Sequence, residues 1–540
     1  MNQSELYFEI YDEAYITIYV VQPNPRIKDT LNRICEHQAD NTWVFQRSRE
    51  VYNQVLKYLL DTFSKDVSTT IHRLPEQVAK AVLDHPNRVM NRYESELLEE
   101  FQSKELWHKL KDYQQVGVRE ALKRKGRILL ADEMGVGKTL QAIAISTVYK
   151  QYLVLVICPR TVLPVWGQEL IRWLDLKSDQ VEVCGTSKEI RSTMNNLYGN
   201  PDPLYIVTTY DLFANNAALL DNRFNFIILD ESQKIKNDST CRATLTMPVI
   251  AKSRYLVLLS GTPVFANPFE LFSQVSLLSP EYFLSIGLFT KRYYIAENTT
   301  QYQTNSDRLL ELHLLLKETV MFRHLKEDID SISLPLKTRA VIPLELYNID
   351  RNKLIVQNDL FKEEWLQTGH YHSWYGHSAE LKIPYIIDCI NNLINNQYKD
   401  KKFIIYCYHD KMMHSIQDFL VDIGVYGVSI AGDTTLKQRE EFSDYFQKND
   451  HCRIMLMKID VAVGITLTAA DIVIFMQLFW TPASIMQAED RAHRIGRESP
   501  VKVLYLLSKH TIDETMFSVI QRKVKIVERI LDGGDGIKFN

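Results

Sequence analysis

Short, continuously apolar runs, each followed by a segment with helical spacing, mark two stretches of the 540-residue chain. The first stretch begins near Leu110, and its five runs lie at 126–133, 152–159, 203–210, 224–232 and 255–261. The second begins near Ile383, and its runs lie at 401–409, 427–433, 452–459, 471–477 and 501–507. Strands that are apolar on both faces are typical of parallel sheets covered by helices on both sides. The pattern therefore predicts an α/β fold with two lobes, each built on a parallel sheet.

The regions around these lobes show different patterns. Residues 8–21 alternate well enough for strands and 51–63 have helical apolar spacing, which predicts a small α+β region before the first lobe. The chain between the lobes is predicted to be mostly helical, and 513–531 indicates a helix that ends at a glycine-rich turn. We therefore expect an accessory region 1–104, a first lobe 105–280, a helical insertion or linker 281–382, a second lobe 383–512, and a C-terminal helix and tail 513–540.

The composition disfavours several classes of protein. Hydrophobic residues make up 46% and charged residues 24%, and the net charge of −4 gives no global basic signature, so any nucleic-acid contact must use local patches. Seven cysteines without a CxxC pair argue against a zinc site and against a disulfide framework. The first residues show no signal-peptide pattern and no apolar run reaches membrane-spanning length. We expect an intracellular protein that is neither secreted nor membrane-bound.

A glycine-rich segment follows the first apolar run and precedes a helix, which is the context of a phosphate-binding loop. Its glycines permit a tight turn whose amides face phosphates, Lys138 suits the β- and γ-phosphates, and Thr139 suits Mg²⁺. A plain glycine turn entering a helix is the alternative, and Asp132 stands where the general motif has its first glycine. We predict ATP binding by Asp132, Glu133, Met134, Gly135, Val136, Gly137, Lys138 and Thr139.

Two carboxylates follow another apolar strand of the first lobe. Asp230 is predicted to bind Mg²⁺ directly or through water, and Glu231 to polarise the attacking water as general base. A solvated strand end would show the same pair, and its distance along the chain from the phosphate loop favours the functional interpretation. The segment 260–263, Ser-Gly-Thr-Pro, is alone a turn; as third in this series it is a candidate sensor of nucleotide state.

Further polar groups are candidates for the same site. The amide of Gln114 can both donate and accept, which suits an adenine edge, although a glutamine on a helix surface is the commoner case. In the segment QAEDRAHRIGR, Arg491 and Arg494 are three apart and are predicted to share a helical face, suited to stabilise charge as a γ-phosphoryl leaves. A helix face salt-bridged to Glu489 and Asp490 is the alternative. Together with the phosphate loop, the arginines favour a two-lobed motor whose cleft closes on ATP.

In this order the segments resemble the Swi/Snf-type helicase-like ATPases of helicase superfamily two, over residues 105–530. The resemblance extends to 158–170, 208–212, 321–329 and 431–442. Similarity to the annealing-helicase subgroup, whose members carry HARP domains before the motor, lies in 380–390, 464–471 and 478–496. Residues 27–60 resemble such a domain through Trp43, Phe45 and Tyr52, and a plain α+β packing role is the alternative.

The resemblance implies two RecA-like lobes, ATP and Mg²⁺ as cofactors, DNA-stimulated ATP hydrolysis, and translocation along duplex DNA. By position it assigns the nucleotide chemistry to Gln114, Gly135, Gly137, Lys138, Thr139, Asp230, Glu231, Gln487, Arg491 and Arg494. Within that set Lys138, Asp230, Glu231, Arg491 and Arg494 are the expected catalytic residues, and Thr139 and Asp230 the metal ligands. DNA-backbone contacts are expected from Arg160, Thr161, Thr209, Tyr210, Thr434, Gly464 and Thr466.

Three departures from the family pattern bear on the coupling between lobes or, for the last, on the contact with DNA or between lobes. Gln233 stands where the family usually has histidine, 458–463 lacks the paired glycines common in the wider family, and Arg497 stands where glutamine is usual. The effect expected of Gln233 is on coupling more than on hydrolysis.

We therefore predict an enzyme, an ATP-driven DNA translocase similar to annealing helicases, which remodels DNA structures or protein–DNA complexes. Its expected partner is duplex, forked or partly single-stranded DNA, with no membrane partner. Gln233 motivates one alternative, an ATP-gated DNA-binding scaffold with little turnover. An RNA-directed helicase of the same superfamily is a second alternative, which the resemblance disfavours. The expected location is the nucleus if the source is a eukaryote and the cytoplasm otherwise.

Overall fold

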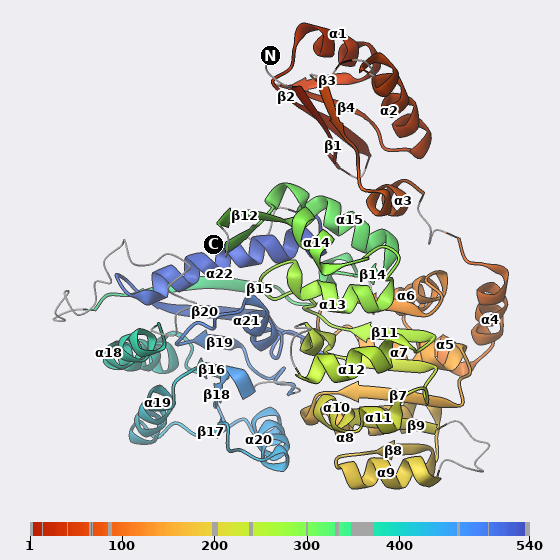
Figure 1. Cartoon of the computed structure of the whole chain (residues 1–540). Coiled ribbons are helices and arrows are strands. Elements are labelled where there is room, and N and C mark those ends of the chain that lie inside the picture. Colours follow the sequence, from red (N-terminus) through yellow and green to blue (C-terminus); the bar gives the residue numbers. More distant parts are fainter. Residues whose placement is uncertain are drawn as a thin grey trace. The chain divides into compact units, whose positions relative to one another are not determined.

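The computed structural model of the chain describes residues 4–12, 14–39, 41–63, 66, 69–84, 89–196, 204–236, 241–298, 301–329, 334–346, 371–461, 465–494 and 496–534. The chain divides into two compact units. Figure 1 shows its helices and strands, coloured along the sequence. The first unit comprises 1–131, 138–323 and 526–535, and the second comprises 132–137, 324–525 and 536–540.

The first unit begins with a small sheet of strand order β3-β4-β2-β1-β5. Its strands are β1 (Ser4–Ile10), β2 (Tyr15–Val21), β3 (Glu36–Ala39), β4 (Thr42–Gln46) and β5 (Thr69–His72). Every second side chain of β1 is buried, as the alternating pattern predicts. The helices of this region are α1 (Pro25–Ile34), α2 (Arg49–Phe63) and α3 (Glu76–Asp84).

The aromatic residues that resemble a HARP domain lie in the core of this small sheet. Trp43, Phe45 and Tyr52 are all buried, and the rings of Phe8 and Tyr52 meet edge to face with centroids 5.4 Å apart. The Trp43 indole donates a hydrogen bond of 2.7 Å to Asn32. These contacts are packing contacts, and the HARP-like assignment stays a prediction.

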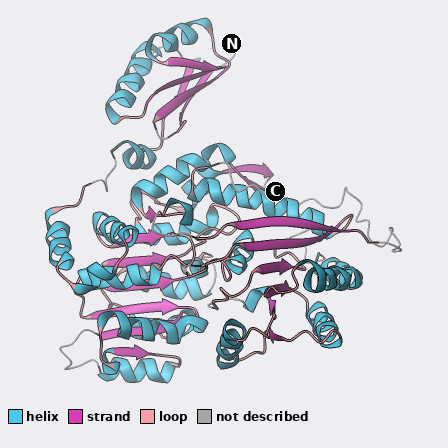
Figure 2. Ribbon diagram, turned by 180° about the vertical axis from the view of Figure 1, so that it is seen from behind, coloured by secondary structure: helices cyan, strands magenta, loops and turns pink. Residues whose placement is uncertain are grey.

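The main sheet of the first unit has the strand order β14-β6-β11-β10-β7-β9-β8, and all its neighbouring strands are parallel. Its strands are β6 (Arg127–Leu130), β7 (Leu153–Cys158), β8 (Val181–Val183), β9 (Leu204–Thr209), β10 (Phe226–Asp230), β11 (Tyr255–Leu259) and β14 (Met321–Phe322). Helices flank the strands (Figure 2): α6 (Asp112–Lys123), α7 (Lys138–Val148), α8 (Leu163–Leu174), α9 (Ser187–Asn196), α10 (Tyr210–Asn215), α12 (Cys241–Ala251) and α13 (Phe269–Leu278).

Both faces of this sheet are buried, which explains the continuously apolar runs. Leu129, Leu155 and Leu258 point into one hydrophobic cluster, whereas their neighbours Ile128 and Val257 point into another on the opposite face. A strand buried on both sides gains no stability from alternating polar residues. The predicted parallel α/β fold is therefore confirmed for this lobe.

The second unit contains a sheet of order β15-β20-β19-β16-β18-β17, again with all neighbours parallel. Its strands are β15 (Lys337–Leu344), β16 (Phe403–Cys407), β17 (Gly427–Ile430), β18 (Ile454–Lys458), β19 (Ile472–Phe475) and β20 (Val501–Ser508). Its helices are α18 (Tyr371–Asn392), α19 (Asp410–Asp422), α20 (Leu436–Lys448), α21 (Pro482–Glu489) and the start of α22 (Ile512–Leu531). Two clusters again cover the two faces, which confirms the second lobe.

The interval 281–382 differs from the helical insertion or linker that the pattern predicts. It does contain α14 (Ile286–Tyr293) and α15 (Leu309–Thr319), and also a hairpin of β12 (Tyr294–Asn298) and β13 (Gln301–Thr304). However, β14 pairs with β6 in the first sheet, and β15 pairs with β20 in the second. β14 has only two residues, and β15 is a partly exposed edge strand that begins with charged residues before the apolar run 340–344, so neither matches the long buried runs of the other strands.

The last helix, α22, belongs to both units along its length. Its residues up to Lys525 lie in the second unit, and residues from Ile526 onward lie in the first. Among the helices that the structure describes, none combines the length and the apolar character needed to cross a membrane.

Candidate nucleotide site

Three of the predicted segments begin at the same edge of the first unit's main sheet. β6, β11 and β10 are adjacent and parallel, and Leu259 is in register with both Leu130 and Asp230. The loop after β6, the turn after β11 and the acidic pair at the end of β10 therefore start next to one another, at the carboxyl ends of adjacent strands. Ligands of open parallel sheets bind beyond the carboxyl ends of strands, which makes this edge the candidate site.

The phosphate loop has the backbone that its glycines allow. Gly135 and Gly137 both have φ of +84°, a conformation that other residues rarely adopt. Val136 between them is buried, and α7 starts at Lys138, so that Lys138 and Thr139 occupy the first turn of the helix. A helix N-terminus of this kind provides amides and a positive dipole end for an anion.

The first two residues of the loop are anchored by the segment that follows β14. The carboxylate of Asp132 accepts a 2.8 Å hydrogen bond from the amide of His324. Glu133 accepts one of 2.6 Å from the amide of Lys326. Asp132 thus replaces the usual first glycine as an acceptor that fixes the start of the loop.

Asp230 ends β10 as a carboxylate held by the surrounding protein. The Trp166 indole donates a 2.8 Å hydrogen bond to it, and the amide of Glu231 donates one of 3.0 Å. Burial and the neighbouring charge of Glu231 raise the pKa of Asp230 to about 6, against the opposing effects of Trp166 and Lys138. A bound cation would favour the ionised form, so the group suits Mg²⁺ binding.

Glu231 has a strained backbone and a fixed side chain. Its φ of +51° lies in the left-handed region, which is uncommon outside glycine. The Gln233 side-chain amide donates a 2.5 Å hydrogen bond to its carboxylate. In turn the Ser260 hydroxyl donates to the Gln233 oxygen at 2.6 Å, and accepts from the amide of Thr262 at 3.1 Å. This relay, Glu231–Gln233–Ser260–Thr262, joins the acidic pair to the turn after β11.

Of the two glutamines expected at the nucleotide, Gln114 also has a local role. Gln114 is buried at the start of α6, and its side-chain oxygen accepts a 3.1 Å hydrogen bond from the amide of Lys111. Gln487 lies within α21. Their assignment to the nucleotide stays a prediction.

The two arginines do not share a helical face, because α21 ends at Glu489 and both follow it in a turn. Arg491 is buried and donates a 3.3 Å hydrogen bond to the carbonyl oxygen of Ile465. Arg494 donates to the Thr466 hydroxyl at 2.8 Å, and a Cβ added at Gly135 would lie 3.2 Å from its Cγ. Arg494 therefore lies beside Gly135, which belongs to the same unit.

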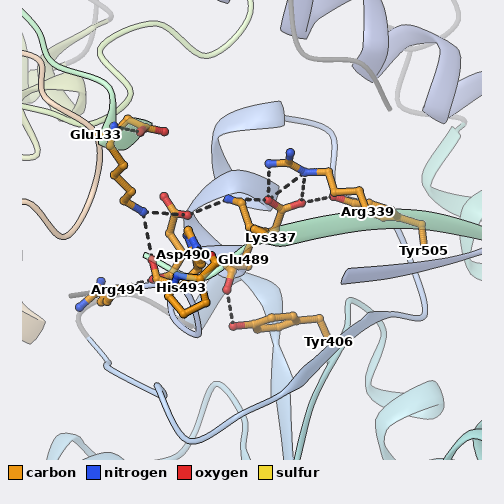
Figure 3. A network of polar contacts seen from close by, with 12 residues as sticks. Glu133, Lys337, Arg339, Tyr406, Glu489, Asp490, His493, Arg494 and Tyr505 are labelled. Atoms are coloured by element: carbon orange, nitrogen blue, oxygen red, sulfur yellow. Dashed lines mark hydrogen bonds and ion pairs between the residues drawn. The ribbon is translucent and has the colours of Figure 1, made fainter. Parts of the chain in front are cut away.

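Glu489 and Asp490 belong to a buried charge network (Figure 3). Lys337 lies 3.1 Å from Glu489 and 3.0 Å from Asp490, and Arg339 binds Glu489 at 2.6 Å. Lys326 binds Asp490 at 3.2 Å and donates to the carbonyl oxygen of His493 at 3.0 Å. Burial would raise the pKa of both carboxyls, but the surrounding cations outweigh it and hold each pKa below its usual range.

The DNA-contact candidates lie in different settings. Arg160 is exposed after β7, next to Thr161, whereas Thr209 caps α10 and Tyr210 donates a 2.8 Å hydrogen bond to the carbonyl oxygen of Asp230. In the second unit the Thr434 hydroxyl accepts a hydrogen bond of 2.9 Å from the amide of Ala431, and the Thr466 hydroxyl accepts one from Arg494. Gly464 lies outside the described residues. Their DNA contacts stay predictions.

Sequence reasoning did not find Trp166 or Arg323, both of which contact this site. Neither lies in a glycine-rich or acidic motif, and each approaches the site from a separate part of the chain. Both residues lie in segments that carry the family resemblance, 158–170 and 321–329, and that resemblance could have indicated them.

Two family profiles match the chain. The SNF2-related domain matches residues 113–362, and the helicase conserved C-terminal domain matches residues 383–496. A solved structure described as "Sulfolobus solfataricus SWI2/SNF2 ATPase core in complex with dsDNA" is 24% identical, covering 79% of this chain and 93% of that chain, with a TM-score of 0.38.

Curated relatives are similar over most of the chain. The SWI/SNF-related matrix-associated actin-dependent regulator of chromatin subfamily A-like protein 1 of Xenopus tropicalis is 32% identical over 77% of this chain and 44% of that protein. The Drosophila melanogaster protein of that name is 30% identical, over 96% of this chain and 66% of its own length. The DNA annealing helicase and endonuclease ZRANB3 of Homo sapiens is 31% identical, over 84% of this chain and 43% of that protein. The chain spans less than half the length of the first of these relatives.

Proposed function

The chain belongs to the SNF2-related family of helicase-like ATPases, and from this premise we propose that it hydrolyses ATP to move along duplex DNA. In doing so it remodels DNA structures or protein–DNA complexes, in the manner of an annealing helicase. The relatives described as DNA annealing helicases support that finer assignment.

One observation carries the proposal: the phosphate-loop helix and the acidic pair meet at one sheet edge of the first unit. Lys138 lies close enough to Asp230 for its charge to lower the carboxyl pKa, and Glu231 follows directly. A phosphate-binding cation, a metal-binding carboxylate and a base are the set that phosphoryl transfer to water requires.

Mg²⁺ would be held by Thr139 and Asp230, and when bound it supplies charge neutralisation for the β- and γ-phosphates. Asp230 fits this task because the Trp166 hydrogen bond leaves the carboxylate fixed, and because a cation relieves its repulsion with Glu231. Among the residues described, no cluster of three or more His, Cys, Asp or Glu side chains offers a metal site. Mg²⁺ commonly keeps several waters and needs few protein ligands.

The remaining steps belong to the protein's own groups. Lys138 binds the phosphates, Glu231 accepts the proton of the attacking water, and Gln233 orients Glu231 through its donated hydrogen bond. We assign Arg491 and Arg494 to the charge on the leaving phosphoryl group. The relay also supports turnover over an ATP-gated scaffold, because the Gln233 amide gives the base a fixed donor.

Steady-state ATP hydrolysis with single-stranded, duplex, forked and bubble DNA, and with RNA, tests the proposal. The expected result is a rate stimulated by DNA and not by RNA. A slow rate that no DNA raises would favour the scaffold, and stimulation by RNA alone would favour an RNA-directed helicase. Closure of a DNA bubble held open by a single-strand-binding protein, dependent on ATP, tests the annealing activity separately.

Two variants test the assignment of residues. Lys138→Ala and Glu231→Gln are each expected to abolish hydrolysis, because they remove the phosphate-binding cation and the base. Lys150→Ala is the matched control, since it removes an exposed lysine from the first unit whose partner is Glu100. Robust turnover by either site variant would refute the assignment.

In a eukaryotic source, action on DNA would place the protein in the nucleus.

A further inference from the structure

Arg323 follows β14 and contacts three elements of the first unit at once. Its guanidinium donates hydrogen bonds to the carbonyl oxygens of Ala131 at 2.6 Å and Gly261 at 3.4 Å. It also donates to both carboxylate oxygens of Asp532, at 2.6 and 3.4 Å. Only 8% of the Arg323 side chain is exposed. A planar group with five donors can hold three acceptors in one fixed arrangement.

The two carbonyl groups lie where the nucleotide site is built. Ala131 is the last residue before the phosphate loop, and its own amide donates a 2.7 Å hydrogen bond to Phe322. Gly261 follows Ser260, whose hydroxyl begins the relay to Glu231. Arg323 therefore sets the spacing between the start of the phosphate loop and the turn that orients the base.

The third partner comes from the end of α22, 209 positions away in the sequence. Packing holds that end in place independently of the ion pair: Val527, Ile530 and Leu531 are part of the first unit's hydrophobic core. The carbonyl oxygen of Ile530 lies 3.1 Å from Nδ1 of His313 on α15.

Gly533 follows directly and shows how closely this end fits. Its φ is +70°, and an added Cβ would lie 3.0 Å from the His313 ring. A side chain there would be strained by the backbone and would press on the ring. The position of the helix end is thus sensitive to a change that touches neither Arg323 nor the nucleotide site.

We propose that Arg323 is a positioning residue for ATP hydrolysis, and that the docked end of α22 holds it in place through Asp532. Arg323 touches no reacting atom; it acts through the backbone at Ala131 and Gly261. Hydrolysis then requires residues 526–534 to be docked on the first unit. The proposal rests on the proposed function for its kinetic readout.

Steady-state kinetics of the full chain with saturating duplex DNA test the proposal through Asp532→Asn and Gly533→Ala. Each is expected to lower kcat about tenfold, the effect of losing the hydrogen bonds between Arg323 and Asp532, with KM for ATP changed less than about threefold. Asp532→Asn removes the charge of the acceptor, and Gly533→Ala displaces the end of the helix that carries it. Arg323→Lys, which cannot reach all three partners, is expected to lose as much. Combining it with Asp532→Asn is expected to add little further loss, because the two residues act as one unit.

The matched control is Asp221→Asn, which breaks the exposed ion pair of Asp221 and Lys252 in the same unit. It is expected to keep wild-type kcat. Wild-type kcat in both Asp532→Asn and Gly533→Ala would overturn the proposal. The proposal would also be overturned if the fractional loss of kcat were no larger than the fraction of unfolded protein, which circular dichroism measures at the assay temperature.

Amide hydrogen exchange of the nucleotide-free protein provides a readout that does not depend on activity. Peptides covering 129–139 and 258–264 are expected to exchange faster in Asp532→Asn than in the wild type. Unchanged exchange there would overturn the proposal. An inactive wild-type chain whose Asp532→Asn variant shows the faster exchange would refute the proposed function, while it would support the part of the proposal in which Asp532 and Arg323 hold the backbone at Ala131 and Gly261.

Discussion

Replacing Gln233 with leucine removes the donor that orients the proposed base. In the structure the Gln233 amide donates a 2.5 Å hydrogen bond to Glu231 and accepts one of 2.6 Å from Ser260. A hydrogen bond to a charged group contributes about 1.5 to 3 kcal/mol. Since each 1.36 kcal/mol changes a rate about tenfold, kcat is expected to fall by roughly one to two orders of magnitude.

The loss is expected in kcat and not in KM, because Gln233 contacts the base and not the phosphate-binding groups. DNA-stimulated ATP hydrolysis over a range of ATP concentrations separates the two. Gln233→His, which restores a donor, is expected to recover most of the rate. The matched control is Gln180→Leu, which removes a glutamine that caps an exposed turn through the amide of Lys177.

Wild-type kcat in Gln233→Leu would refute the reasoning. Ser260 is buried, so the substitution also leaves its hydroxyl without this acceptor. A large fall in the thermal midpoint would therefore attribute the loss to folding. The Gln233→His variant distinguishes these causes, because a recovered rate requires the donor.

Gly135→Ala is expected to abolish ATP hydrolysis, because φ of +84° at this position disfavours any side chain; wild-type ATPase activity would contradict this. The Asp230 pKa of about 6 means that Mg²⁺ must displace a proton below that pH, so the half-saturating Mg²⁺ concentration is expected to rise as pH falls from 7 to 5.5. A half-saturating Mg²⁺ concentration that stays the same between pH 7 and 5.5 would argue against Asp230 as the ligand. Lys382→Met breaks a fully buried 2.8 Å ion pair with Asp513 and is expected to cost about 3 to 5 kcal/mol, measured by urea unfolding. Asp513→Asn in the same chain is expected to recover part of that stability, and an additive loss would contradict the pairing.

The candidate site was predictable where a motif follows an apolar run. The phosphate loop after β6 and the acidic pair after β10 are local signals: a buried parallel strand needs continuous apolar residues, and a ligand needs polar groups at its end. The same reasoning failed for β15, a partly exposed edge strand whose first residues include the charged Lys337 and Arg339. It also placed Arg491 and Arg494 on a helix, which ends before them.

The sequence by itself determined the two parallel lobes, the order along the chain of their continuously apolar strands, and the residue types at the ends of those strands, because these follow from local periodicity. Only the tertiary structure decided which side chains meet. Arg323 and Asp532 are 209 positions apart, and Arg339 and Glu489 are 150 apart, yet each pair is in contact. Periodicity shows which face of an element is buried, but the partner of a buried charge depends on which distant elements pack there. The chemistry of the site is therefore local in sequence, and its support is not.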